Sequence, residues 1–135
     1  STTVNLDTVI NAPIFATEEW NDNSSLYTVS GNQLTITQTG RYKVNVNLSI
    51  ASSSNSGRKA PEAYIDISGT QQGAYANTSY MRRANGHETS SLHLNEVLSL
   101  TAGNVLTIKI TRSANSNTAT LRSSGTSNFY IERID

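Results

Sequence analysis

Residues 40–50 read Gly40-Arg41-Tyr42-Lys43-Val44-Asn45-Val46-Asn47-Leu48-Ser49-Ile50. Apolar side chains occupy every second position from Tyr42 to Ile50, and polar side chains fill the positions between them. This period of two is typical of a β-strand with one buried and one polar face. The strand is long for a globular protein, and Gly40 marks the turn before it. We therefore expect it to lie in the centre of a sheet, with Tyr42 buried.

The same alternation recurs on both sides of this segment. Val4 to Ile10 predicts an edge strand that breaks at Pro13, and the residues from Thr17 to Asn23 predict a loop. Further strands are expected around residues 26–29, 34–36, 63–67, 75–81, 90–100, 106–110 and 129–134. No segment keeps a 3.6-residue period over three turns, and no fixed repeat is visible. The pattern predicts an all-β fold, a two-sheet sandwich or a barrel.

Length and composition limit the function. A chain of 135 residues suits one domain, which we expect to span residues 1–135. Ten basic residues balance ten acidic ones, so nucleic acid is not an expected partner. No apolar stretch approaches the ~20 residues that cross a bilayer, so no membrane insertion is expected. The chain has no cysteine and is rich in Ser, Thr and Asn, which is common on extracellular and virion β-proteins.

The sequence shows little sign of catalytic or metal chemistry. The two histidines, His87 and His93, lack the spacing of a metal site, and Asn21-Asp22-Asn23 reads as a turn rather than a calcium loop. There is no Gly-x-Ser-x-Gly elbow and no glycine-rich phosphate loop. We expect no metal, no cofactor and no enzymatic activity.

One cluster carries the residue types of a recognition site. Aromatic rings that stack on sugars stand beside amide and guanidinium donors in a single segment. The predicted ligand-binding residues are Tyr75, Asn77, Tyr80, Arg82, Arg83, Asn85, His87 and Glu88. In the alternative interpretation, Tyr80 and Met81 belong to the core and the arginines form a solvated edge. We expect Trp20 to be a core or interface residue rather than a sugar platform.

Three motifs, in order, carry a resemblance to a known family. Residues 40–44 resemble the G-x-Y-x-V opening of the central strand in globular heads of the complement-one-q and tumour necrosis factor (TNF) superfamily. Residues 98–106, Leu-Ser-Leu-Thr-Ala-Gly-Asn-Val-Leu, are similar to that family's L-x-L-x-x-G-D-x-V turn. Residues 127–134 are similar to the closing strand of phage and bacterial members. Asn104 replaces the usual acidic residue, and residues 1–25 fit the family only loosely.

The resemblance implies a TNF-like jelly-roll β-sandwich of two antiparallel sheets and ten strands, which forms a homotrimer at the end of a fibre or stalk. The central strand, the 90–100 strand and the closing strand would share one sheet, and its outer face would pack around the threefold axis. The implied trimer-interface residues are Arg41, Lys43, Asn45, Asn47, His93 and Asn95. Alternatively, this face is an ordinary solvated sheet surface.

Our functional hypothesis is a non-enzymatic trimeric head domain of a phage tail or head fibre, or of a bacterial surface filament. It would bind a host surface glycan or protein, and it would lie on the virion surface or on the outside of a cell. A second hypothesis is a purely structural trimerisation cap of a fibre, and a glycan depolymerase is a third.

Overall fold

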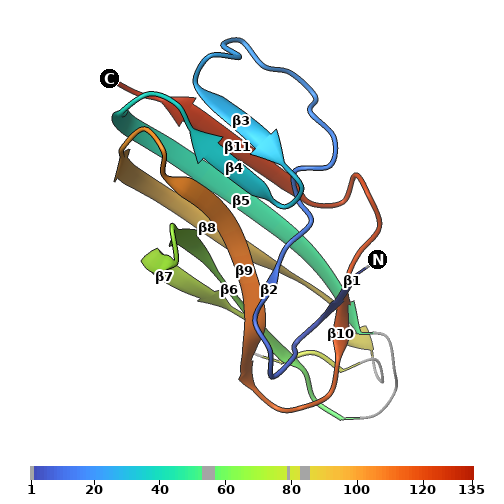
Figure 1. The fold of residues 1–135 in the computed structure, drawn as a ribbon. Coiled ribbons are helices and arrows are strands. Elements are labelled where there is room, and N and C mark those ends of the chain that lie inside the picture. Colours follow the sequence, from blue (N-terminus) through green and yellow to red (C-terminus); the bar gives the residue numbers. More distant parts are fainter. Residues whose placement is uncertain (1, 53–56, 79, 83–85) are drawn as a thin grey trace.

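The computed structural model describes residues 2–52, 57–78, 80–82 and 86–135, and the named elements within these ranges are all β-strands. They form two antiparallel sheets that pack face to face, as predicted (Figure 1). Sheet A contains β1 (Thr2–Val4), β10 (Ala119–Leu121), β5 (Gly40–Ser52), β11 (Asn128–Arg133) and β8 (Thr89–Leu100). Sheet B contains β3 (Tyr27–Ser30), β4 (Gln33–Ile36), β9 (Val105–Ala114), β6 (Ala60–Ile67), β7 (Thr70–Asn77) and β2 (Ile10–Asn11).

The long strand β5 is central in sheet A, which confirms the sequence prediction. It pairs with β8 along nearly its whole length, from Gly40 opposite Leu100 to Ala51 opposite Thr89. On its other edge it pairs with β11 and then with β10. The chain termini lie near opposite ends of this strand, because β1 reaches it through β10 near Ile50 while the amide of Ile134 donates to Arg41 O (Figure 1).

The alternation in β5 sorts its side chains between the core and the surface. Tyr42, Val44, Leu48 and Ile50 are fully buried, and they meet the inward side chains of β6 and β9 in one apolar cluster. The hydroxyl of Tyr42 donates to Gln38 O at 2.7 Å, so this aromatic residue is buried without leaving its polar atom unpaired. The predicted burial of Tyr42 is confirmed.

The last strand of sheet A is interrupted, which gives eleven strands in the described residues where the resemblance implies ten. Residues 122–127 leave the sheet between β10 and β11, yet they still satisfy the backbone of Ser49 on β5. The amide of Arg122 donates to Ser49 O at 2.9 Å, and the amide of Ser49 donates to Ser127 Oγ at 2.9 Å. The interruption therefore leaves no unpaired group on the central strand at this point.

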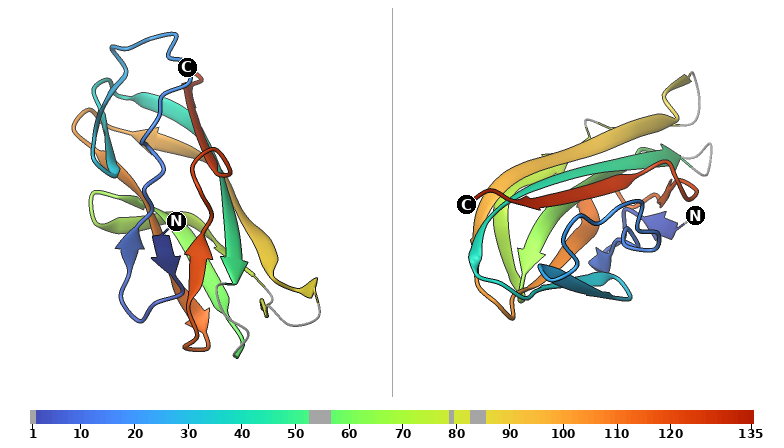
Figure 2. Two further views of the ribbon diagram at one scale, coloured as in Figure 1. Left: turned by 90° about the vertical axis from the view of Figure 1, so that its right-hand side faces the viewer. Right: turned by 90° about the horizontal axis from the view of Figure 1, so that it is seen from above.

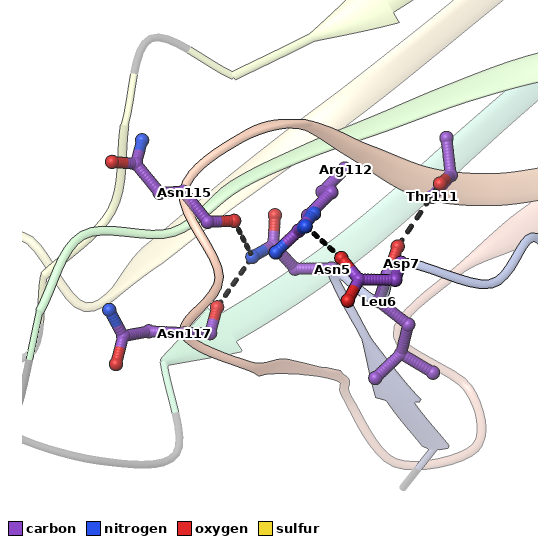
Figure 3. A network of polar contacts seen from close by, with 7 residues as sticks. All are labelled: Asn5, Leu6, Asp7, Thr111, Arg112, Asn115 and Asn117. Carbon is purple, nitrogen blue, oxygen red and sulfur yellow. Dashed lines mark hydrogen bonds and ion pairs between the residues drawn. The ribbon is translucent and has the colours of Figure 1, made fainter.

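The expected edge strand from Val4 to Ile10 is wrong. The chain turns at Asn5, whose φ is 61°, so β1 joins sheet A and β2 joins sheet B. Asn5 is buried, and its amide group donates to Asn115 O at 3.2 Å and to Asn117 O (Figure 3). Its Oδ1 accepts from the amide of Ala60 at 3.1 Å. An apolar/polar alternation does not reveal such a turn, because Asn tolerates the left-handed conformation without a glycine.

The residues after Asn5 are held by a second set of contacts. Asp7 forms an ion pair with Arg112, and Thr111 Oγ1 donates to Leu6 O at 3.1 Å (Figure 3). Both partners lie on β9, so the crossing from sheet A to sheet B is fixed against that strand.

The sandwich has two open sides, and each is closed differently. On one side β7 and β8, the edge strands of the two sheets, contact each other directly. On the other side, the segment before β3 runs past β11 and the β3–β4 hairpin (Figures 1 and 2). This segment includes residues 17–23, which form no helix or strand, as expected.

Candidate functional site

The outer face of sheet A gathers the residues that the resemblance assigns to a trimer interface. Arg41, Lys43, Asn45 and Asn47 of β5 all point away from the core, as do His93 and Asn95 of β8, and all are exposed or half-buried. The strand register aligns them in rows with β11. Asn45 lies between Asn95 and Tyr130, and Asn47 lies between His93 and Asn128.

This outer face is polar at its centre and apolar in two places. Val97 is 57% exposed and Tyr130 is 36% exposed, although neither type of side chain favours water. Asn47 Oδ1 is inaccessible to solvent and accepts no hydrogen bond in the described residues, which costs free energy in an isolated chain. A partner that covered this face would bury the side chains of Val97 and Tyr130 and could donate a hydrogen bond to Asn47 Oδ1.

The structure divides the predicted ligand-binding cluster into two parts. Tyr75 and Asn77 lie on β7, on the outer face of sheet B, while the other described members lie in the connection to β8. This corrects the expected strand at 75–81, since β7 begins at Thr70 and ends at Asn77, and Met81 makes only an isolated bridge with Lys59. The described members in the connection are Tyr80, Arg82, His87 and Glu88. Arg83 and Asn85 lie outside the described residues.

Within the connection, both interpretations of the cluster hold in part. Met81 is buried, as the core interpretation expects, but Tyr80 is exposed and carries the guanidinium of Arg58 5.2 Å from its ring centre. The amide of Arg82 donates to His87 O at 2.7 Å, which brings these two residues side by side. Their side chains are exposed.

On β7, the structure adds a partner that the sequence analysis missed. The rings of Tyr75 and Tyr64 lie 5.1 Å apart at 59°, and Asn77 Nδ2 donates to Glu62 Oε2 in the neighbouring row. Burial, and to a smaller extent the neighbouring Tyr75, raises the pKa of the Tyr64 phenol. A tilted aromatic pair beside a carboxylate–amide pair has the donors, acceptors and flat apolar faces that sugars use.

A pocket of about 360 Å³ lies on the other side of the molecule, beside the edge of β11 that no described strand pairs with. We call it the β11 pocket. Its floor is formed by Phe15 and Phe129, whose rings meet edge to face at 4.8 Å, and by Ile131. Trp20 stands at its rim with 64% of its surface exposed, so the structure excludes the core role of the two that were expected, and the interface role stays a prediction.

Carboxylates surround the phenols of the β11 pocket. Burial first, then Glu18 and Asp22, raises the pKa of Tyr27. Tyr130 donates its hydroxyl to Glu132, and this hydrogen bond, with smaller effects of burial and of Asp22, raises the pKa of Tyr130. Two phenols from distant parts of the chain therefore sense the same Asp22 carboxylate.

The turn that carries Asp22 is built by two asparagines, as expected. The amide of Asn23 donates to Asn21 Oδ1 at 3.1 Å, and the amide of Ser25 donates to Asn23 Oδ1 at 3.1 Å. In the described ranges no group of three or more His, Cys, Asp or Glu side chains is arranged to hold a metal ion. In those same ranges no helix is long and apolar enough to cross a membrane.

Comparison with known proteins finds similarity at the level of structure. No protein-family model matches the sequence, and no curated protein matches it. The structure is similar to that of murine APRIL at pH 8.5, with a TM-score of 0.61 and 13% identity over 96% of this chain and 95% of that one. It is equally similar to the TNF Eiger from S. frugiperda, with a TM-score of 0.61 and 13% identity over 98% of this chain and 90% of that one.

These similarities define the fold. The chain is a TNF-like jelly-roll β-sandwich, as the three sequence motifs predicted, and both structural neighbours are covered over nearly their whole length. In agreement with the resemblance, β5, β8 and β11 share one sheet. At 13% identity, the similarity concerns the fold, and the function has to be argued from the surfaces.

Proposed function

We propose that this chain is a non-enzymatic, homotrimeric recognition head of a phage tail or head fibre, or of a bacterial surface filament. It binds a host surface glycan or protein and lies on the virion surface or on the outside of a cell. The fibre context and the ligand class rest on the sequence resemblance and on the surface chemistry.

The observation that carries the trimer is the outer face of sheet A. Its rows are in register across β8, β5 and β11, it leaves Val97 and Tyr130 uncovered, and it holds the unsatisfied Asn47 Oδ1. The jelly-roll fold supports this use of the face, because the superfamily that the sequence resembles assembles as trimers. Three copies would also multiply weak single-site contacts with a host surface through effective concentration.

The recognition part of the proposal rests on the exposed groups of the 75–88 segment and on the Tyr64–Tyr75 pair. Replacing Arg82 and Arg83 together with Ala tests the segment. We expect weaker binding to cells or to a glycan array, with an unchanged trimer and a nearly unchanged melting temperature, because Arg82 is exposed and changes at exposed side chains shift stability by about 0.5 kcal/mol or less.

Tyr75→Ala provides a second probe of the same surface, on β7.

Light scattering at micromolar concentration must return three times the chain mass of 14.6 kDa, and a mass of one chain would contradict the trimer. A protein that is trimeric but binds no cells or glycans would instead be a structural cap of its fibre.

A further inference from the structure

The β11 pocket has the volume of a small-molecule site and a chemically uneven lining. Phe15, Phe129 and Ile131 form an apolar floor, and Trp20 and Tyr27 add ring faces and edges around it, while Tyr130 borders the pocket from the outer face of sheet A. Aromatic faces carry partial negative charge, so rings around a pocket favour either a sugar or a cation.

The charges around the pocket distinguish these two ligands. The lining contains four carboxylates, those of Glu18, Glu19, Asp22 and Glu132, in a chain that has ten acidic residues in all. Glu18 accepts a hydrogen bond from Asn21 at 3.1 Å, and Glu132 accepts one from Tyr130. Glu19 and Asp22 have no hydrogen bond or ion pair with any residue that the structure describes.

The positive charge of the lining is already paired. Arg133 Nε lies 2.9 Å from Asp135 Oδ1, and its Nη1 donates to Gln38 Oε1 at 3.1 Å. The guanidinium of Arg133 is thus held toward the start of β5, and the free carboxylates of Glu19 and Asp22 remain without a counter-charge from it.

We propose that the β11 pocket binds a cationic group on an apolar stem, namely an arginine or lysine side chain of a partner protein. The stem would lie on the Phe15–Phe129 floor, and the charged head would meet the ring of Trp20 and the carboxylates of Glu19 and Asp22. Both parts of the lining are then used, since a cation over an aromatic face is stabilised by the ring and by nearby negative charge. A neutral sugar could donate hydroxyl hydrogen bonds to these carboxylates, but it would not neutralise their charge.

This inference rests on the proposed recognition function, because it names a ligand class for such a head and assigns it to a different surface from the 75–88 segment. Its failure is separable from failure of the trimer or of host attachment, because the test below uses binding of a small probe.

The pocket contains its own reporter. Trp20 is the only tryptophan of the chain, so intrinsic fluorescence of the whole protein reports on the pocket rim. The probe is acetyl-arginine methylamide, and its matched control is acetyl-citrulline methylamide, which has nearly the same shape without the charge. We expect a change in Trp20 fluorescence with a dissociation constant on the order of millimolar for arginine, and binding weaker by at least about tenfold for citrulline.

The double variant Glu19→Gln with Asp22→Asn should weaken arginine binding by about fivefold or more, because it removes the two free carboxylates. Both side chains are exposed, so the fold should be retained, and circular dichroism checks this. Glu96→Gln is the matched control, since it removes one carboxylate on β8, keeps an oxygen that can accept from the amide of Ala74, and should leave binding unchanged. The strand β8 pairs with the opposite edge of β5 from β11, so this control lies away from the pocket.

Three results would overturn the inference. Equal binding of arginine and citrulline would mean that charge is not recognised, and no fluorescence change with either at roughly 100 mM, far above the expected dissociation constant, would mean that the pocket is not a site for this ligand. Binding of methyl galactoside in preference to arginine would assign the pocket to sugars. Light scattering on the same samples reports the oligomeric state independently.

Discussion

The carboxylate of Glu96 on β8 accepts a hydrogen bond of 2.6 Å from the backbone amide of Ala74 on β7. These two strands are edge strands of different sheets, so this bond joins sheet A to sheet B on one open side of the sandwich. Glu96 lies on the same face of β8 as Leu94 and Leu98, whose side chains are buried in the core. Its carboxylate accepts the hydrogen bond of an edge amide, that of Ala74. A carboxylate on an edge also protects that edge against pairing with another chain.

Glu96→Ala should therefore destabilise the protein by about 1 kcal/mol, because the Ala74 amide loses a charge-assisted partner at a partly exposed site. Denaturant melts measure the loss, and hydrogen exchange should become faster at the amide of Ala74. Glu88→Ala removes an exposed carboxylate just before β8 that makes no hydrogen bond or ion pair with any residue that the structure describes, and it should change stability by less than about 0.5 kcal/mol. Equal effects of the two substitutions would contradict the role of Glu96.

Gly73 should resist substitution for two reasons. Its φ is 71°, which L side chains rarely adopt, and a Cβ there would lie 2.3 Å from the carboxyl carbon of Glu96. We expect Gly73→Ala to cost about 1–2 kcal/mol from the backbone alone, with an added cost from displacing the Glu96 side chain. In the Glu96→Ala background the added cost should disappear, so a double-mutant cycle separates the two. Additive effects would show that Glu96 does not constrain Gly73.

Much of the fold was predictable because the period of two is a local property. The apolar faces of β5, β8 and β9 follow directly from alternation, and three short motifs were sufficient to suggest the TNF-like topology. The turn at Asn5 was not predictable, because its cause is a set of partners more than fifty residues away in sequence. For Trp20 the sequence left a core and an interface role open, because aromatic character does not reveal whether a loop is covered, and the structure excludes the core role.

The surfaces were predicted less completely than the fold. Tyr64 was missed because its pairing with Tyr75 depends on a register shift in β6–β7. With the register that places Ile67 opposite Thr70, Tyr64 would lie opposite Gly73. The register shift between Ala63 and Ile65 places Tyr75 beside Tyr64 instead. The β11 pocket combines residues about a hundred positions apart, so no local sequence pattern predicts it. The six residues on the outer face of sheet A were predictable, since β5 and β8 alternate regularly; their role in a trimer stays a prediction.

Asn5 allows the backbone and side-chain contributions to one turn to be separated. Asn5→Gly keeps the favourable backbone at φ 61° but loses the three side-chain hydrogen bonds, and it should cost about 2 kcal/mol or more. Asn5→Ala loses the bonds and also strains the backbone, so it should cost about 1 kcal/mol more than Asn5→Gly. Chemical denaturation measures both. If Asn5→Ala were the more stable variant, the left-handed turn at Asn5 would be excluded.

Tyr42 should control stability at the centre of the core and at high pH. Tyr42→Ala should cost about 3 kcal/mol or more, while Tyr42→Phe should cost about 1 kcal/mol for the hydroxyl bond to Gln38 O. Burial raises the pKa of Tyr42 above its ordinary value of 10.0. The folded state therefore holds this proton more tightly than the unfolded state, so the stabilisation is present below about pH 10 and is lost as the pH rises above it. Denaturant melts across this pH range should show that the free energy of unfolding falls less steeply with pH in Tyr42→Phe than in the unchanged protein. If stability fell equally with pH in both proteins, the raised pKa would not belong to Tyr42.

Asn45→Glu tests whether the outer face of sheet A is the trimer interface. Asn45 lies between Asn95 and Tyr130 in the middle row of that face, so in a trimer the new carboxylate would be desolvated without a cationic partner in the same row. In an isolated chain the side chain is only half-buried, and the fold should survive. We expect the mass measured by light scattering to fall to that of a single chain, 14.6 kDa, while the circular dichroism spectrum stays that of a β-protein. Thr28→Glu adds the same charge at an exposed position of β3 in sheet B and should leave the trimer intact. If the Asn45 variant remained trimeric, the subunits would have to meet through another surface.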